Sequence, residues 1–152
     1  MPCEYEKFFT EVFHLEDPSD APTKQHEIYF NEIQKFIKKN SIFTPSQVIK
    51  CLSKNNKLTH IDLNRMEKEL KIFSVTYLSG GSNIGYPAFQ FDLQAGITKP
   101  VISSILKPLN GMYKNWDLAF WLNSYFHDLG GSIIEVLDSG SLKSLLREVS
   151  NI

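Results

Sequence analysis

The chain has 152 residues, of which 42% are hydrophobic and 22% are charged. These proportions predict a folded protein with one domain of ordinary size, or two small ones, and exclude a disordered chain. No stretch approaches the roughly 18 apolar residues that a transmembrane helix needs, and the acidic first residues do not resemble a secretory signal. The two cysteines, Cys3 and Cys51, are too few for a disulfide framework, so we expect a reducing, cytoplasmic location.

The net charge of −1 conceals a strong segregation along the sequence. Residues 1–33 contain eight acidic and two basic residues, whereas residues 34–71 contain nine lysine or arginine residues and only three acidic ones. A basic block of this density fits an electrostatic footprint for nucleic acid. It fits equally well a solvated surface that is merely rich in lysine.

The first expected elements are an acidic arm and an amphipathic helix. Residues 1–22 carry weak local signals and are expected to form an arm or a short helix that ends in a breaker rich in Asp and Pro. A helix is expected over residues 23–40, because apolar residues recur there at intervals of three and four positions. That apolar face consists of Tyr29, Ile33, Phe36 and Ile37.

Two capping signals then predict a pair of short helices. Thr44 and Gln47 can form a capping box at the start of the first, with a proline at its first helical position. Thr59 and Asp62 have the same spacing at the start of the second, which should run to about residue 71. Two helices joined by a few polar residues are typical of a helix-turn-helix.

A β-hairpin is expected after the helix pair. Its strands should span residues 72–78 and 86–92, and the loop between them contains three glycines that permit positive φ. The proline of the second strand has no N–H, so this strand should lie at a sheet edge or begin at the proline. Strand alternation places Phe89 and Phe91 together on a core face and Gln90 on the other side.

The remaining residues, 96–152, are predicted to be helical. Trp116 to Asn123 is apolar almost all round, which is typical of a helix buried in a bundle or in a protein interface. The expected fold class is mainly α with a small β-hairpin. A helix-turn-helix or winged-like part over 23–95 precedes a small helical bundle over 96–152. Each helix of the bundle has a candidate capping residue, namely Thr98, Asn115, Ser132 and Ser141.

The second helix of the pair is the candidate DNA-reading element. Its apolar side chains and its polar side chains fall on separate faces at 100° per residue. Asn can pair with adenine, and Lys can bond guanine or phosphate. A solvated amphipathic helix shows the same separation, so both interpretations stay open. The candidate DNA-binding residues are Lys57, His60, Asn64, Arg65, Lys68 and Lys71.

No catalytic or metal site is expected. The four histidines lack Cys, His or carboxylate neighbours at metal-ligand spacing, apart from the adjacent pair His127-Asp128. Ser79-Gly80-Gly81-Ser82 joins two strands and is not followed by Lys-Ser/Thr, so it does not fit a phosphate loop. No Gly-x-Ser-x-Gly nucleophile motif occurs. We therefore expect a protein that is not an enzyme and that needs no cofactor or metal.

Five short motifs follow one another in the second half of the chain, namely Tyr86-Pro87-Ala88-Phe89-Gln90-Phe91-Asp92, Val101-Ile102-Ser103-Ser104-Ile105-Leu106, Trp121-Leu122-Asn123, Leu129-Gly130-Gly131 and Glu135-Val136-Leu137. In their order and spacing, residues 72–149 resemble the Xre/MbcA/ParS antitoxin family. The pattern departs from the family where a Pro-Asn pair and a later proline are replaced by Ser124-Tyr125-Phe126 and Ser132-Ile133-Ile134.

The resemblance implies an antitoxin of a type II toxin–antitoxin pair. It implies a DNA-binding N-terminal part and a toxin-binding C-terminal part, a RES-domain toxin that acts on NAD, and steric inhibition by a tail at Leu142 to Ile152. The complex would bind its own operator DNA, as a homodimer or a larger toxin–antitoxin assembly. The implied toxin-binding residues are Trp121, Leu129, Gly130, Gly131, Leu142, Leu145, Leu146 and Arg147.

Two other functions remain open. A stand-alone winged helix-turn-helix transcription regulator, whose C-terminal part dimerises, would bind specific DNA without a partner. An adaptor or immunity-like binding module would make no DNA contact, so charge reversal at Lys68 and Lys71 would change nothing.

Overall fold

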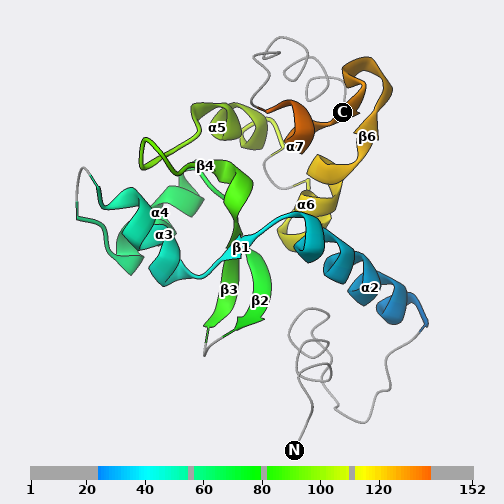
Figure 1. Cartoon of the computed structure of the whole chain (residues 1–152), viewed down its shortest axis with the longest axis horizontal. Coiled ribbons are helices and arrows are strands. Elements are labelled where there is room, and N and C mark those ends of the chain that lie inside the picture. Colours follow the sequence, from blue (N-terminus) through cyan, green and yellow to red (C-terminus); the bar gives the residue numbers. More distant parts are fainter. Residues whose placement is uncertain (1–23, 55–56, 80–81, 110–111, 138–152) are drawn as a thin grey trace, which may run out of the picture.

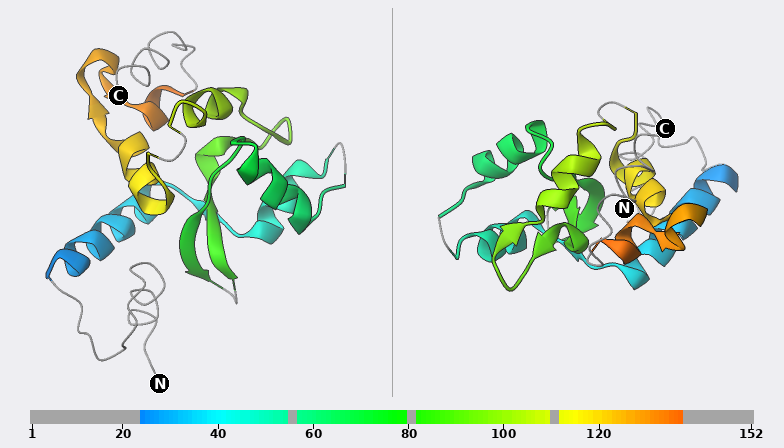
Figure 2. Two further views of the ribbon diagram at one scale, coloured as in Figure 1. Left: turned by 180° about the vertical axis from the view of Figure 1, so that it is seen from behind. Right: turned by 90° about the horizontal axis from the view of Figure 1, so that it is seen from above.

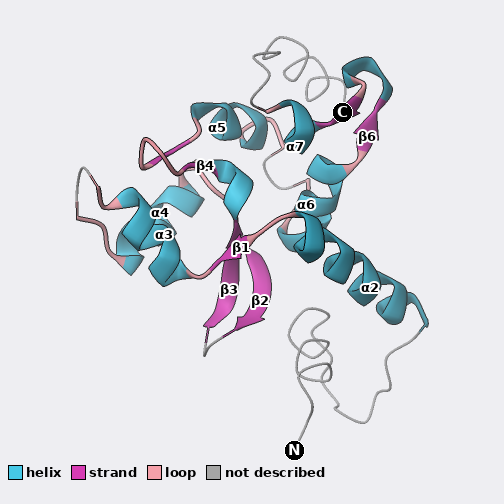
Figure 3. Ribbon diagram, in the orientation of Figure 1, coloured by secondary structure: helices cyan, strands magenta, loops and turns pink. Residues whose placement is uncertain are grey.

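The computed structural model describes residues 24–54, 57–79, 82–109 and 112–137 (Figure 1). Helices alternate with short antiparallel sheets, so the expected class of mainly α with a small β part is confirmed (Figure 3). Within these ranges, no helix combines the length and the apolar character required to cross a membrane. The helices and strands are α2 (Lys24–Lys39), β1 (Ile42–Phe43), α3 (Pro45–Leu52), α4 (His60–Lys68), β2 (Val75–Ser79), β3 (Ser82–Pro87), β4 (Phe91–Asp92), β5 (Ile97–Thr98), α5 (Pro100–Leu106), α6 (Asn115–Asn123), β6 (Tyr125–Phe126), β7 (Gly131–Ser132) and α7 (Ile133–Val136).

A three-stranded antiparallel sheet in the order β1-β3-β2 lies in the middle of the molecule. The expectation that the second hairpin strand is an edge strand, or begins at its proline, is wrong. β3 is the central strand, and Pro87 is its last residue, opposite Ile42 of β1. Position 85, inside β3, requires a glycine, because a Cβ there would collide with the Ile42 side chain and would lie 2.8 Å from Cβ of Tyr77.

Capping explains where several helices begin. The capping boxes predicted at Thr44 and Thr59 are both present, and so is a third at Ser132, whose Oγ accepts a hydrogen bond from the Glu135 N–H. The caps expected at Thr98 and Asn115 are wrong, because α5 and α6 begin without a side-chain cap.

Two hydrophobic cores flank the sheet. Figures 1 and 2 show α3 and α4 on one side and α2 and α6 on the other. α2 packs on α6, where the ring centroids of Phe36 and Trp116 are 5.7 Å apart and the Tyr29 hydroxyl donates to Asp117 at 2.9 Å. The larger core thus combines α2 with the C-terminal helices. The smaller core, beneath α3 and α4, is formed by Val48, Leu52, Leu63, Ile72, Tyr86 and Phe91.

The chain passes from one core to the other at Gln90. A 3₁₀ turn over Ala88–Gln90 follows β3, so Phe89 packs on the larger core and Phe91 lies in the smaller one. The expectation that these two rings share one face is therefore wrong. The expectation for Gln90 is also wrong, because its side chain is not on an opposite, polar face but is 0% exposed.

The buried Gln90 amide satisfies backbone groups on both sides of the hairpin. Its Oε1 accepts a hydrogen bond from the Phe73 N–H at 2.7 Å. Its Nε2 donates to the Phe73 carbonyl at 3.0 Å and to the Pro87 carbonyl at 3.1 Å. Phe73, two residues before β2, and Pro87, the last residue of β3, are thereby tied to one side chain.

α6 is fixed to the outer edge of β2 through Thr76. The side chain of Asn115 accepts from the Thr76 N–H and donates to the Thr76 hydroxyl, both at 2.7 Å. The Trp116 indole donates to the Thr76 carbonyl at 2.8 Å. Asn115 therefore serves the sheet edge and not the start of its own helix.

Replacement of Gln90 by alanine should destabilise the fold, because it leaves a buried N–H and buried carbonyls without partners. Each such group costs about 1–3 kcal/mol, so we expect the free energy of unfolding in urea to fall by at least about 2 kcal/mol. The matched control is Gln94→Ala at an exposed glutamine, which should change stability by less than about 0.5 kcal/mol. Equal stability of the two variants would contradict this role.

Candidate nucleic-acid interface

The faces of α4 are separated as the sequence predicts. Leu63 is buried in the smaller core and Met66 packs against it. The polar side chains of the predicted stripe, His60, Asn64, Lys68 and Lys71, are all exposed. The helix ends at Lys68, earlier than expected, because Leu70 has a φ of +57°. The Lys71 N–H then bonds the Met66 carbonyl at 2.9 Å, which closes the helix end as in a Schellman motif.

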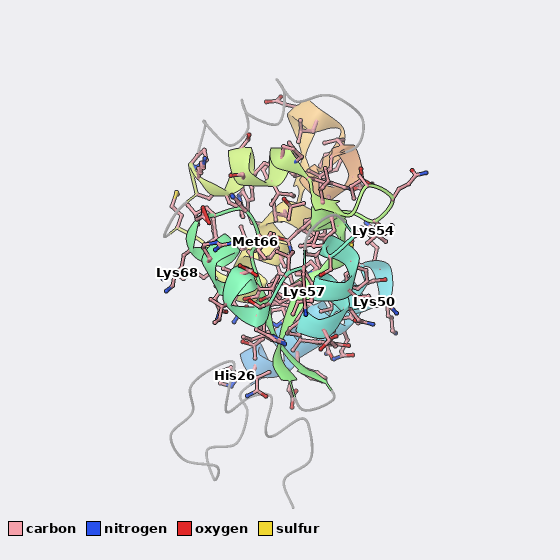
Figure 4. All side chains as sticks on the ribbon, turned by 90° about the vertical axis from the view of Figure 1, so that its left-hand side faces the viewer. His26, Lys50, Lys54, Lys57, Met66 and Lys68 are labelled. Atoms are coloured by element: carbon pink, nitrogen blue, oxygen red, sulfur yellow. The ribbon has the colours of Figure 1, made fainter. Side chains whose placement is uncertain are left out.

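Three lysines of this region have ammonium groups available to a ligand. Lys50 is on α3, Lys57 precedes α4, and Lys68 is at the end of α4; Figure 4 shows all three on the same side of the molecule. Each is exposed. Among the described residues, none forms an ion pair or hydrogen bond with these ammonium groups.

The other cations of the region have partners within the protein. Arg65 lies 2.9 Å from an Asp62 oxygen and 3.6 Å from a Glu69 oxygen, and Lys71 lies 3.7 Å from Glu69. Such exposed pairs are weak, so a phosphate can displace them. Lys54 is different, because its Nζ donates to the carbonyls of Leu93 and Gln94 at 2.9 and 3.4 Å and thereby fastens the turn between β4 and β5 to α3.

The acidic residues on and just after α4 form contacts with other residues of the protein. Burial, and then the nearby Glu67 carboxylate, raise the pKa of Tyr86, whose hydroxyl lies 3.5 Å from Glu67. Hydrogen bonds from the Thr59 N–H and hydroxyl hold the pKa of Asp62 below its usual value, with Arg65 adding to the effect. All three acids of the region thus have partners within the protein, since Glu69 pairs with Arg65 and Lys71.

Two further features distinguish this surface. Ile61 is 77% exposed in the middle of the polar face of α4. The sequence alone could have indicated this exposure, because at 100° per residue Ile61 points almost opposite to Leu63, which is a core residue. The second feature is the lack of charge on the hairpin, since residues 72–98 contain no Lys, Arg or His.

The C-terminal residues implied by the family resemblance lie in a packed aromatic group. Trp121 stacks on Tyr113 at 5.8 Å between centroids and meets Phe126 edge-on at 5.3 Å. Leu129 packs against the larger core. Gly130 has a φ of +68°, and Gly131 is buried in β7 beside the Glu135 side chain. Leu142, Leu145, Leu146 and Arg147 lie outside the described residues.

Tyr125 is an exposed aromatic residue of this C-terminal part that is not among the toxin-binding residues implied by the resemblance. Its side chain is 69% exposed, and it begins β6, which pairs with β7. The neighbouring Phe126 is half-buried against Trp121. The exposed Tyr125 thus lies next to the packed rings of Phe126 and Trp121. Tyrosine is a residue type enriched at protein interfaces.

Across the described segments, no group of three or more His, Cys, Asp or Glu side chains could hold a metal ion. A pocket of about 330 Å³ between the end of α4 and the start of α6 is lined by aliphatic and aromatic side chains, together with polar ones that include Glu67 and Lys114. Comparisons with family models, curated proteins and solved structures give no match for the chain.

Replacement of Asp62 by asparagine should destabilise the protein at pH 7 and have less effect in acid. The folded-state pKa of this carboxyl is depressed, so its contribution exists above the unfolded value of about 3.9 and is lost as the pH falls through the folded value. We expect urea unfolding at pH 7 and pH 3 to show a gap between Asp62→Asn and wild type that narrows at pH 3. The control is Asp128→Asn, at an exposed aspartate outside the capping boxes, which should change stability at pH 7 by less than about 0.5 kcal/mol. A gap of the same size at both pH values would contradict the role.

Proposed function

We propose that this protein is the antitoxin of a type II toxin–antitoxin pair, which binds duplex DNA through α3 and α4 and a toxin through its C-terminal part. The observation that carries the DNA-binding half is the group of three exposed lysines, Lys50, Lys57 and Lys68, without partners among the described residues. Ammonium groups placed in this way neutralise phosphates and release counterions, which is the main source of affinity for DNA.

The order of elements supports α4 as the helix that enters the major groove. The succession α2, β1, α3, α4, β2, β3 with strand order β1-β3-β2 is compatible with the winged helix-turn-helix that the sequence predicts. In a helix-turn-helix the second helix of the pair reads the bases while the first crosses the backbone. Because α2 packs on α6, α3 and α4 are the helices that this proposal places against DNA.

The hairpin has a different role from that of a basic wing. It carries no cationic side chain between residues 72 and 98, so any contact that it makes with DNA uses backbone groups and neutral side chains. Within residues 45–98, the electrostatic affinity therefore comes from the helix pair and not from the hairpin. This assigns the salt dependence of binding to a small number of lysines.

The C-terminal part supports a separate surface for a protein partner. Tyr125 projects from the packed group of Trp121, Phe126 and Tyr113. The resemblance in motif order names the partner as a RES-domain toxin that acts on NAD. On this proposal, the β6–β7 region anchors the toxin while the tail beyond the described residues covers its active-site entrance.

The double variant Lys57→Gln, Lys68→Gln should weaken binding to duplex DNA and make it less dependent on salt. Each lost phosphate contact lowers the slope of log affinity against log salt by about 0.9, so the slope should fall by about two. Fluorescence anisotropy across a salt series measures it. Lys35→Gln, Lys38→Gln on α2 removes the same charge elsewhere and should leave the slope near wild type. A slope unchanged in the first variant would remove the helix pair from the interface.

Tyr125→Ala should weaken toxin binding by at least about tenfold, as expected of an interface tyrosine. The toxin is first obtained by pull-down of the tagged full-length protein from its native cell, as a partner that stops growth when expressed alone. Titration calorimetry then compares Tyr125→Ala with Leu93→Ala, a large apolar residue that is also exposed, at 52%, but lies on the β4–β5 turn. Equal affinity of both variants would exclude the β6–β7 surface, and recovery of no toxic partner would count against the antitoxin itself.

A further inference from the structure

Ile61 occupies the most outward position of α4. At 100° per residue it lies about 160° from Leu63, which points into the smaller core, and within about 20° of Lys68. Its side chain is 77% exposed, more than any other large hydrophobic residue that is exposed in the described segments. It contributes to neither core. The apex of the polar face is therefore apolar.

The fold gives no reason for an isoleucine at this position. A β-branched side chain lowers helix propensity relative to Leu, Lys or Glu, and here it gains no burial in return. An apolar group at the centre of a basic surface is useful when the ligand offers a methyl group among phosphates. The major groove of DNA offers that combination, because the C5-methyl of thymine projects into it.

We propose that Ile61 contacts the C5-methyl group of thymine, while Asn64 on the next turn pairs with adenine, so that α4 selects A·T base pairs. This inference rests on the proposed binding of DNA by α3 and α4. Ile61 and Asn64 are about 4.5 Å apart along the helix axis, close to the base-pair rise of about 3.4 Å, so they reach adjacent base pairs. Lys68, about 10.5 Å further along from Ile61, reaches a phosphate.

The composition of the face favours duplex DNA over other ligands. A single-stranded nucleic acid is held by stacking on aromatic side chains, and the exposed residues of α4 include only one ring, that of His60. An acidic protein would suit the lysines but offers no counterpart for an isolated, fully projecting isoleucine flanked by Asn64 and Lys68. The duplex matches the cations, the amide and the apolar apex together.

The experiment begins with selection of random duplexes by the full-length protein, at a salt concentration where binding is measurable. The selected duplex is then synthesised once with thymine and once with deoxyuridine, which lacks only the C5-methyl group. Wild type should bind the thymine duplex about fourfold more tightly for each contacted methyl, the value expected for burial of one methyl group.

A mutant cycle assigns this preference to Ile61. In Ile61→Ala the preference for thymine should disappear, and the variant should bind the deoxyuridine duplex nearly as well as wild type does. Ile28→Ala, at an isoleucine of α2 that is 54% exposed, should keep the full preference. Because Ile61 is exposed and alanine favours helix, circular dichroism should show both variants folded.

The outcomes separate this inference from the proposed function. Salt-dependent binding without enrichment of any sequence, or a thymine preference that persists in Ile61→Ala, would overturn the role of Ile61 and leave DNA binding intact. No binding to any duplex would overturn the proposed DNA-binding function. Unchanged DNA affinity in Ile61→Ala together with weakened toxin binding would make this face a protein surface and would also overturn the inference.

Discussion

The buried amide of Gln90 is the interaction on which the arrangement of the molecule depends. It lies where the chain leaves β3 and passes from the larger core to the smaller one, between Phe89 and Phe91. The side chain holds Phe73 and Pro87, and the backbone carbonyl of Gln90 accepts the Lys99 N–H at 2.8 Å, just before α5. One residue thus sets the start of β2, the end of β3 and the approach to α5.

This junction gives the two surfaces different supports. The smaller core lies directly beneath α3 and α4, so the helices that carry the exposed lysines pack on Leu63, Tyr86 and Phe91. The larger core carries α6 and the β6–β7 hairpin, and it is fastened to the sheet where Thr76 meets Asn115 and Trp116. On the proposed function, DNA and a protein partner are bound on separate parts of one folded unit.

The local signals of the sequence predict the starts of helices well, and the contacts between distant segments poorly. Thr44, Thr59 and Ser132 cap their helices because a capping box needs only residues three positions apart. Asn115 is also of a residue type that caps helices, yet its amide bonds Thr76, which is 39 residues away. The sequence did not predict the 3₁₀ turn at Ala88–Gln90, because the alternation of Phe, Gln and Phe is also typical of a strand. Only the fold shows that the two phenyl rings enter different cores.

The candidate site divides in the same way. The polar stripe of α4 was predictable because it depends only on the helical period. The pairing of Arg65 and Lys71 with Glu69, the fastening of the β4–β5 turn by Lys54, and the contact between Glu67 and Tyr86 required the fold. These contacts decide which cations are available to a ligand, and they favour Lys50, Lys57 and Lys68 over Lys71.

The central claim is that this helix pair meets duplex DNA while the β6–β7 region stays free for a partner. The most direct test is amide hydrogen exchange of the full-length protein with and without duplex DNA at low salt. The account predicts slower exchange within residues 45–71 and no change within residues 115–137; slower exchange confined to residues 115–137, or none anywhere, would contradict it.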